Sequence, residues 1–296
     1  MPEMPELEAH AERLTAQFEG RALSGFTPFN FTALKTAQPE PSAAFGFRLL
    51  GVDRRGKYLL LRFEPVTFVV HLMQGGRLLP ETPRPGKPLS MKPRGGQARF
   101  MFDAPDDDTD DVPAALLLTE QGKERRAGVW CVPTADSFSA PPLDKLGPEA
   151  ATISADELSA LFAANSMRIH GFLRNQRMIA GIGRRLANEV CHRARISPFA
   201  TTGKLGADGA AQVADAIHGC IAESLEFERS RGDMSSSKDR TSAAHNRTGD
   251  DCPRSPEHGP DTIRAVEYSG YTVNYCPTCQ TGGKILADNT TSKFLK

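Results

Sequence analysis

The chain has 296 residues, enough for two domains that each contain a core. Lysine plus arginine and aspartate plus glutamate both number 36, so the overall charge gives no support to a nucleic-acid partner. No run of eighteen apolar residues occurs, and the start lacks the basic and apolar segments of a secretory signal. We therefore expect a soluble, intracellular protein.

The chain begins MPEMPE, and this start indicates chemistry at the amino terminus. If Met1 is removed, the Pro2 nitrogen becomes a secondary amine, and an α-amino group with a pKa of about 7.7–8.0 is partly unprotonated near neutral pH. Such an amine attacks an aldehyde-like carbon to give an iminium, while Glu3 can move protons and Glu6 is a second carboxylate nearby. The alternative is a tail that only starts a helix, because apolar residues at helical spacing follow it.

After this first helix, the sequence up to about Pro133 is rich in short β-branched and aliphatic runs. Gly, Pro and Asp clusters separate the runs, which is typical of a sandwich or barrel. The expected strands are 58–63, 67–72, 98–102, 114–118 and 129–132. We assign residues 1–133 to an N-terminal β-rich domain with a leading helix, and residues 134–150 to a linker.

The next part of the chain is predicted to be helical. Ser154 and Glu157 have the spacing of a capping box at the start of its first helix. The further expected helices are 169–175, 185–194 and 209–228. The polar stretch 229–250 has almost no large apolar residues, so we expect a mobile loop there. Residues 151–250 are therefore assigned to a helical domain with a flexible loop.

A metal site is predicted near the C-terminus. The runs 262–268 and 271–275 flank Ser269-Gly270, which is typical of a two-residue hairpin turn. The four candidate ligands, two on each side of this hairpin, are Cys252, His258, Cys276 and Cys279. A hairpin brings its ends together, so these residues can hold one structural Zn²⁺ in a finger formed by residues 251–296. The alternative for His258 is a surface histidine, because its spacing from the first cysteine is less typical.

Two basic positions are candidates for binding an anion. Lys57 stands at the mouth of an apolar strand, where its charge favours an uncharged Pro2 amine; the simpler alternative is a lysine that only flanks a strand. The turn Gly181-Ile182-Gly183 lets the backbone approach a phosphate closely. Such a turn is often no more than a turn, but Arg184 and Arg185 follow it and together they indicate contact with a DNA backbone.

Several segments, in this order and spacing, resemble the formamidopyrimidine-DNA glycosylase/endonuclease VIII family. They are Pro2-Glu3, Arg55-Gly56-Lys57-Tyr58-Leu59, His71-Leu72, Ala180-Gly181-Ile182-Gly183, Ala187-Asn188-Glu189-Val190 and Cys276-Pro277-Thr278-Cys279-Gln280. The resemblance covers nearly the whole chain. It implies an α+β fold with an N-terminal β-sandwich, a helix–two-turn–helix DNA-binding domain and a C-terminal zinc-finger β-hairpin.

The resemblance also implies a bifunctional enzyme of base-excision repair. Such an enzyme flips a damaged nucleotide out of double-stranded DNA, excises the oxidised base and cleaves the strand by β,δ-elimination through a Schiff base. Pro2 would then be the nucleophile, Glu3 the acid–base group, Lys57 a phosphate contact and Glu6 a support of the pocket. We expect a cytoplasmic, nucleoid-associated monomer that acts on damaged bases or abasic sites.

Among the positions expected to contact DNA, some depart from the family pattern. Gly183 is retained, but Arg184 stands where asparagine is common, and arginine can still hold a phosphate. Gln74 replaces the methionine that fills the gap left by the flipped base, which is similar to the endonuclease VIII branch. Arg125 aligns with the arginine that contacts the orphaned base, whereas Ala127 replaces the usual aromatic wedge.

The predicted finger departs as well. Tyr271 stands where the family usually carries an arginine that grips phosphates, so this task is either weakened or moved to Arg264 or Lys284. These changes leave open a second function, a non-catalytic protein that binds damaged DNA or junctions on the same scaffold. RNA binding by the helices around the glycine turn is a more remote third possibility.

Overall fold

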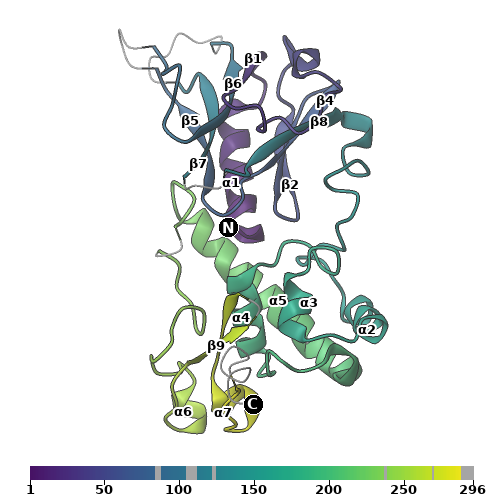
Figure 1. The fold of residues 1–296 in the computed structure, drawn as a ribbon, viewed down its shortest axis with the longest axis vertical. Coiled ribbons are helices and arrows are strands. Elements are labelled where there is room, and N and C mark those ends of the chain that lie inside the picture. Colours follow the sequence, from purple (N-terminus) through teal and green to yellow (C-terminus); the bar gives the residue numbers. More distant parts are fainter. Residues whose placement is uncertain (84–87, 105–111, 122–124, 237–238, 269, 288–296) are drawn as a thin grey trace. The chain divides into compact units, whose positions relative to one another are not determined.

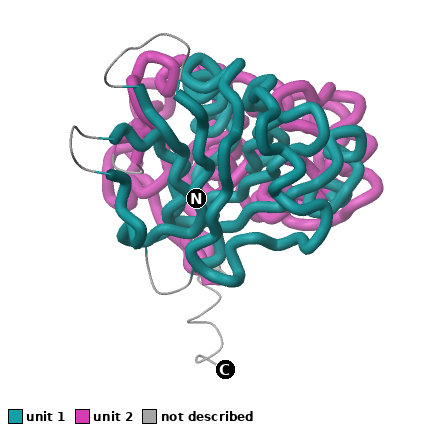
Figure 2. Tube along the Cα trace, turned by 90° about the horizontal axis from the view of Figure 1, so that it is seen from above, with its two compact units in different colours: residues 1–145 teal, residues 146–296 magenta. Residues whose placement is uncertain are grey.

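The structure is a computed structural model that describes residues 1–83, 88–104, 112–121, 125–236, 239–268 and 270–287. It divides into two compact units, Met1–Lys145 and Leu146–Lys296 (Figures 1 and 2). Within the described residues, no helix combines the length and the apolar composition that crossing a bilayer requires. Each unit is built from its own elements and has its own core.

Unit 1 starts with helix α1, Met4–Phe18, as the apolar spacing predicts. Proline occupies its first turn, where the missing N–H costs no hydrogen bond. One face carries Leu7, Ala11, Leu14 and Phe18, all buried. The helix ends before Gly20, whose φ of +80° turns the chain into the first strand.

Two antiparallel four-stranded sheets follow α1 within the described residues, so the predicted sandwich is confirmed. Their orders are β1-β6-β7-β5 and β2-β3-β4-β8. The strands are β1 Leu23–Pro28, β2 Gly51–Arg55, β3 Tyr58–Arg62, β4 Val66–His71, β5 Gly76–Glu81, β6 Gly96–Phe102, β7 Ala115–Glu120 and β8 Gly128–Pro133. Phe68 of the second sheet contacts Phe26 and Phe100 of the first, with ring centroids 5.7 and 5.2 Å apart. These rings form part of the core between the sheets.

Three strands, β1, β2 and β5, were missing from the prediction, and all three lie at a sheet edge. An edge strand needs fewer apolar residues because one of its sides has no neighbouring strand. β5 even contains Pro80, which an edge accommodates. The pairing partner, rather than the local sequence, makes these segments strands.

Unit 2 contains the predicted helices. They are α2 Ala155–Ala164, α3 Ile169–Arg174, α4 Arg184–Arg193 and α5 Gly206–Arg229. The predicted capping box is present, because the Ser154 hydroxyl accepts from the Glu157 N–H at 3.2 Å and the Glu157 carboxylate accepts from the Ser154 N–H at 2.8 Å. Phe162 of α2 packs edge-on against Phe172 of α3, with ring centroids 5.0 Å apart, so the two helices share one core.

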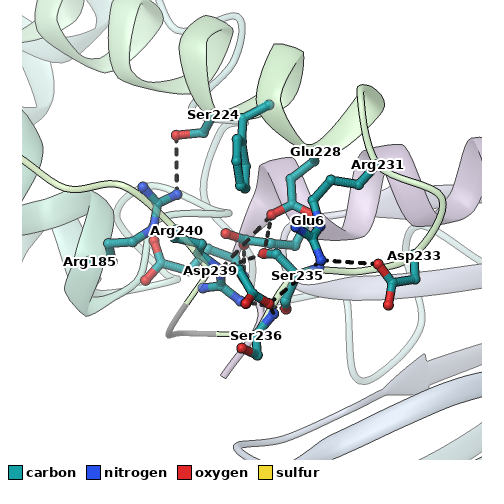
Figure 3. A network of polar contacts seen from close by, with 12 residues as sticks. Glu6, Arg185, Ser224, Glu228, Arg231, Asp233, Ser235, Ser236, Asp239 and Arg240 are labelled. Carbon is teal, nitrogen blue, oxygen red and sulfur yellow. Dashed lines mark hydrogen bonds and ion pairs between the residues drawn. The ribbon is translucent and has the colours of Figure 1, made fainter.

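Polarity predicts a mobile loop after α5, and in the structure several groups of this stretch form hydrogen bonds with helices α4 and α5. Glu228 accepts two hydrogen bonds from Ser235, from its hydroxyl and from its N–H, and the Ser235 hydroxyl in turn accepts from Arg240 at 2.8 Å (Figure 3). Further on, the Glu189 carboxylate of α4 accepts from three successive N–H groups, of residues 243–245, at 2.7–3.0 Å. Polarity here reflects hydrogen bonding to helices, which composition alone does not distinguish from solvation.

The chain then forms the predicted hairpin, β9 Arg264–Tyr268 and β10 Tyr271–Tyr275, flanked by the short helices α6 Ser255–His258 and α7 Pro277–Thr281. Gly270 in its turn has φ +78°, a conformation that glycine adopts without strain. The α+β fold class, with its helical part and C-terminal finger, is thus confirmed.

Candidate functional site

The amino-terminal residues form the first part of the site, in unit 1. Met1 is exposed, whereas Pro2, Glu3 and Glu6 are buried. Glu3 is the N-cap of α1, and its own N–H donates to the Glu6 carboxylate at 2.6 Å. A carboxylate at this place is stabilised by the unpaired N–H groups of the first turn. Glu6 thus binds the backbone of Glu3, the residue that follows Pro2.

Lys57 lies in the tight turn between β2 and β3 and is buried. Gly56 before it has φ +56°, which makes a two-residue turn possible at this point. His71 of β4 is the strand partner of Tyr58 of β3. Burial lowers the pKa of His71 to about 4, and the positive charges of Lys57 and of the chain's amino terminus contribute in the same direction. These two cations therefore lie near the same imidazole.

His71 is a candidate site residue to which sequence reasoning assigned no role. Its Nδ1 accepts from the Met73 N–H at 3.2 Å, so it links the amino-terminal site to the loop that carries Gln74. Met73 has φ +55°, in the left-handed region that residues with a Cβ rarely adopt. Gln74 is exposed at the tip of this loop. The signal in the sequence was the His71-Leu72 pair, which matched the family without an assigned task.

Arg125 is exposed beside residues that the structure does not describe. Close to it, the buried Glu120 carboxylate accepts from the Ala127 N–H at 2.6 Å. Ala127 is itself buried, so its side chain has no role as an exposed wedge. The glutamate holds the end of this loop at the sheet.

In unit 2, one side chain braces the glycine turn. Gln176 accepts from the Gly181 N–H at 3.0 Å and donates to the carbonyls of Ile182 and Arg174 at 2.8 and 2.9 Å. Gly183 is the buried N-cap of α4 and lacks a capping side chain, and the exposed Arg184 is the first residue of that helix. Backbone N–H groups and a guanidinium at a helix start favour an anion.

Helix α4 also positions the hairpin. The Asn188 side chain accepts from the Asn274 N–H at 3.3 Å and lies 2.8 Å from His245 Nδ1. Asn188 is fully buried, so these contacts satisfy an otherwise costly amide. Asn188 and Glu189 are adjacent polar residues in the middle of α4 because Asn188 binds the hairpin and Glu189 binds the backbone of residues 243–245.

The structure gathers the four predicted metal ligands, so His258 is not simply a surface histidine. The ligand atoms of Cys252, His258, Cys276 and Cys279 all lie within 4.8 Å of one another. The Cys252 and Cys279 sulfurs are 3.6 Å apart, and the Cys276 sulfur is 3.9 Å from His258 Nε2. Tetrahedral zinc with Zn–S distances of about 2.3 Å separates its sulfur ligands by about 3.8 Å. The donor set and its spacing therefore fit one such ion.

Side chains around the cluster tie it to α4. His192 Nε2 lies 3.4 Å from the Cys252 sulfur, and burial, together with Arg254, lowers the pKa of His192 to about 4. Gln280 accepts from the Cys276 N–H at 2.8 Å and donates to the Ile196 carbonyl at 3.0 Å. Outer contacts of this kind orient the ligands of a metal.

At the other end of the hairpin, Tyr271 is half-buried and contacts two side chains of α3. The Arg174 guanidinium lies over its ring, and the His170 ring stacks on it. The spacing of four between these two residues places them on one face of α3.

The chain combines a β-sandwich with a leading helix, paired helices and a Cys₃His hairpin, and a solved structure of MutM bound to DNA has the same fold, with a TM-score of 0.78 at 19% identity. The family model for the formamidopyrimidine-DNA glycosylase N-terminal domain matches residues 1–110. A formamidopyrimidine-DNA glycosylase-like protein of Mycobacterium tuberculosis is 39% identical over 153 residues, 51% of this chain and 94% of that protein. The formamidopyrimidine-DNA glycosylase of Chloroflexus aurantiacus is 29% identical over 293 residues, 95% of this chain and 98% of that enzyme.

Solved structures agree with these sequence comparisons. The MutM (Fpg) protein of Thermus thermophilus superposes with a TM-score of 0.77 at 25% identity, covering 96% of this chain and all of that one. Lactococcus lactis formamidopyrimidine-DNA glycosylase bound to abasic-site DNA superposes with a TM-score of 0.78 at 19% identity, covering 94% and 99%. The chain belongs to the formamidopyrimidine-DNA glycosylase/endonuclease VIII family, and is a DNA-repair glycosylase of that family.

Proposed function

We propose that this protein is a bifunctional DNA glycosylase and abasic-site lyase whose nucleophile is the Pro2 amine, formed once Met1 is removed. The observation that carries the proposal is the arrangement at the amino terminus. Glu3 caps α1, Glu6 binds its backbone, and the Lys57 ammonium and the amino group of Met1 both help burial to lower the pKa of His71. The exposure of Met1 is compatible with its removal.

In this reaction, the uncharged Pro2 nitrogen attacks C1′ of the damaged nucleotide. The nitrogen–C1′ bond forms, the bond from C1′ to the base breaks, and the base leaves with the proton of the Pro2 nitrogen. The C1′–O4′ bond of the sugar ring then breaks, O4′ takes up a proton from Glu3, and the nitrogen lone pair forms the iminium. The resulting iminium withdraws electrons, so a base removes a C2′ proton and the 3′ phosphate departs by β-elimination, with the 5′ phosphate following by δ-elimination. Glu3 is the proton carrier, and Lys57 contacts a phosphate and favours the uncharged amine by charge repulsion.

Unit 2 binds the backbone of double-stranded DNA that contains a damaged base or an abasic site. Gly183 and Arg184 bind a phosphate at the start of α4. In unit 1, Gln74 fills the gap left by the flipped nucleotide and Arg125 contacts the orphaned base. The Cys₃His cluster holds one structural Zn²⁺, which supplies no chemistry to the reaction and fixes the hairpin. One chain carries all proposed groups, so we propose a monomer that works at the nucleoid.

The test is covalent trapping. Wild-type protein incubated with abasic-site DNA and borohydride should give a stable adduct, because borohydride reduces the iminium to an amine. Pro2→Gly should reduce the adduct sharply, and a duplex with a tetrahydrofuran site, which cannot form an iminium, should give none. Mass spectrometry of the adduct should place the link at residue 2. A wild-type protein that binds abasic DNA well and traps nothing would exclude this function.

The second candidate is the non-catalytic binder, and the observation in its favour is that Ala127 is buried where a wedge is expected. The two candidates differ in the effect of Glu3→Gln. The enzyme loses strand cleavage and retains DNA binding. A binder leaves the DNA intact in both proteins, and its affinity is unchanged.

A further inference from the structure

Tyr271, the first residue of β10, contacts a cation and a ring that come from the same helix. Arg174 Cζ lies 3.7 Å from the centroid of the Tyr271 ring. The His170 ring is nearly parallel to it, with an angle of 20° and centroids 5.6 Å apart. His170 and Arg174 are one helical turn apart, so α3 presents both on one face to the hairpin.

This contact fixes where the arginine lies. His170 is buried, whereas Arg174 and Tyr271 are half-buried, so the contact extends from the core to the surface. The Arg174 carbonyl is bonded to Gln176, the same side chain that braces the turn at Gly181 and Ile182. Arg174 is therefore connected, by one side chain, to the turn from which α4 starts.

The other cations considered for the finger lie elsewhere in unit 2. Arg264 pairs with Tyr275, and Tyr271 with Tyr268, so Arg264 and Tyr271 are at opposite ends of the hairpin. Four residues of strand separate them by about 13 Å. Lys284 follows α7, on the metal side of β10. Among the cations named here, Arg174 is the one held at the turn end of the hairpin.

We propose that Arg174 binds a DNA phosphate and that Tyr271 holds its guanidinium in position. A cation from α3 then binds phosphate at the end of the hairpin where β10 has a tyrosine. Stacking on a ring uses the face of a guanidinium, while phosphate oxygens bind the N–H groups in its plane. An arginine already held in place loses less conformational entropy when it binds. This inference rests on the proposed function in that it takes DNA as the ligand.

The experiment measures affinity for a duplex with a tetrahydrofuran site, which is not cleaved, over a range of salt concentrations. Arg174→Ala should weaken binding about tenfold, equally for different flanking sequences. It should also reduce the slope of log affinity against log salt by about 1, because one fewer counterion is released. Tyr271→Ala should reduce the salt slope nearly as much as Arg174→Ala does. Tyr271→Phe, which keeps the ring, should reduce it much less.

A rescue and a control separate this role from packing. Arg174→Ala combined with Tyr271→Arg, which puts the charge on the hairpin itself, should restore the slope. Arg195→Ala removes an exposed arginine that is paired with Glu257 beyond the far end of α4, and it should change the slope by much less. The thermal midpoint of each variant reports whether it is folded. An unchanged slope in folded Arg174→Ala, or an equal loss in Arg195→Ala, would overturn the inference.

The failure of this inference is distinct from failure of the proposed function. If wild-type protein traps abasic DNA and folded Arg174→Ala keeps the full salt slope, Arg174 is no phosphate contact and the lyase proposal stands. If wild-type protein binds DNA with an Arg174-dependent slope and traps nothing, the phosphate contact stands and the lyase proposal fails.

Discussion

Two histidines of unit 1, His10 and His71, make its stability depend on pH. The His10 Nε2–H group donates one hydrogen bond to the Leu78 carbonyl at 2.7 Å. Burial lowers the pKa of His10 to about 4, and Arg13 and Arg77 contribute in the same direction. His71 is lowered to about 4 as well, by burial, Lys57 and the amino terminus. Both imidazoles are therefore neutral in the folded protein at pH 7.

These two histidines predict a loss of stability in mild acid. Between pH 6.5 and 4 the unfolded chain binds protons at both sites and the folded chain does not, so the stabilisation present above pH 6.5 falls as the pH drops towards 4. Each site contributes up to about 3 kcal/mol. His10→Gln keeps an N–H donor without titrating, and should flatten the dependence. Urea unfolding followed by fluorescence of Trp130, the single tryptophan, measures it in unit 1. Equal pH dependence in wild type and variant would contradict this explanation.

At the scale of elements, polar side chains on or next to helices and strands order the connections between these elements. Glu189 of α4 accepts from three N–H groups of residues 243–245, Gln176 braces the glycine turn, and Glu120 holds the end of a strand connection. Each of these groups satisfies backbone donors that have no partner in a helix or sheet. Connections that composition marks as loops are fixed in this way.

We predict that Glu189→Gln loosens the stretch after α5. The neutral amide loses the charge-assisted bonds to the three N–H groups and should cost about 1–3 kcal/mol. Amide hydrogen exchange at residues 243–245 should become faster, while exchange in α2 stays the same. The matched change Glu223→Gln alters a partly exposed ion pair with Arg193, and should cost less than about 1 kcal/mol. Equal effects of the two substitutions would show that Glu189 does not order this stretch.

At the scale of the whole molecule, the two units are stabilised differently. Unit 1 has a sandwich core of aromatic and aliphatic side chains, in which Phe63, Phe68 and Phe100 are fully buried. The finger of unit 2 has a small core around Ala244, Ile263 and the cluster cysteines. Burial raises the pKa of the Cys276 and Cys279 thiols, so without a cation these sulfurs are protonated and contribute no ligand bonds. A segment of this kind depends on its metal for folding.

Removal of the metal should therefore act on one unit. Chelation is expected to lower the unfolding temperature of the finger, seen as loss of hydrogen-exchange protection in β9 and β10, and to abolish DNA binding. Trp130 fluorescence should still report unfolding of unit 1 at its original temperature. Re-addition of zinc should restore both signals. A chelated protein whose β10 amides remain protected would exclude a structural metal at Cys252, His258, Cys276 and Cys279.

The sequence by itself determined the parts with strong local signals. Apolar spacing gave α1 and the central strands, the Ser154–Glu157 pair gave the start of α2, and the cysteine spacing gave the metal ligands. These signals are local because each depends on a helical or strand period or on a short ligand motif. The family motifs added the proposed roles of Pro2, Glu3 and Lys57, which remain predictions.

Tertiary structure decided the rest. The edge strands β1, β2 and β5 exist because a neighbour pairs with them, and the stretch after α5 is held by Glu189 and Glu228, which lie outside it. The contact of Arg174 with Tyr271 joins residues 97 positions apart, as their numbers show. No local period encodes such a contact, because it depends on how α3 and the hairpin pack within unit 2.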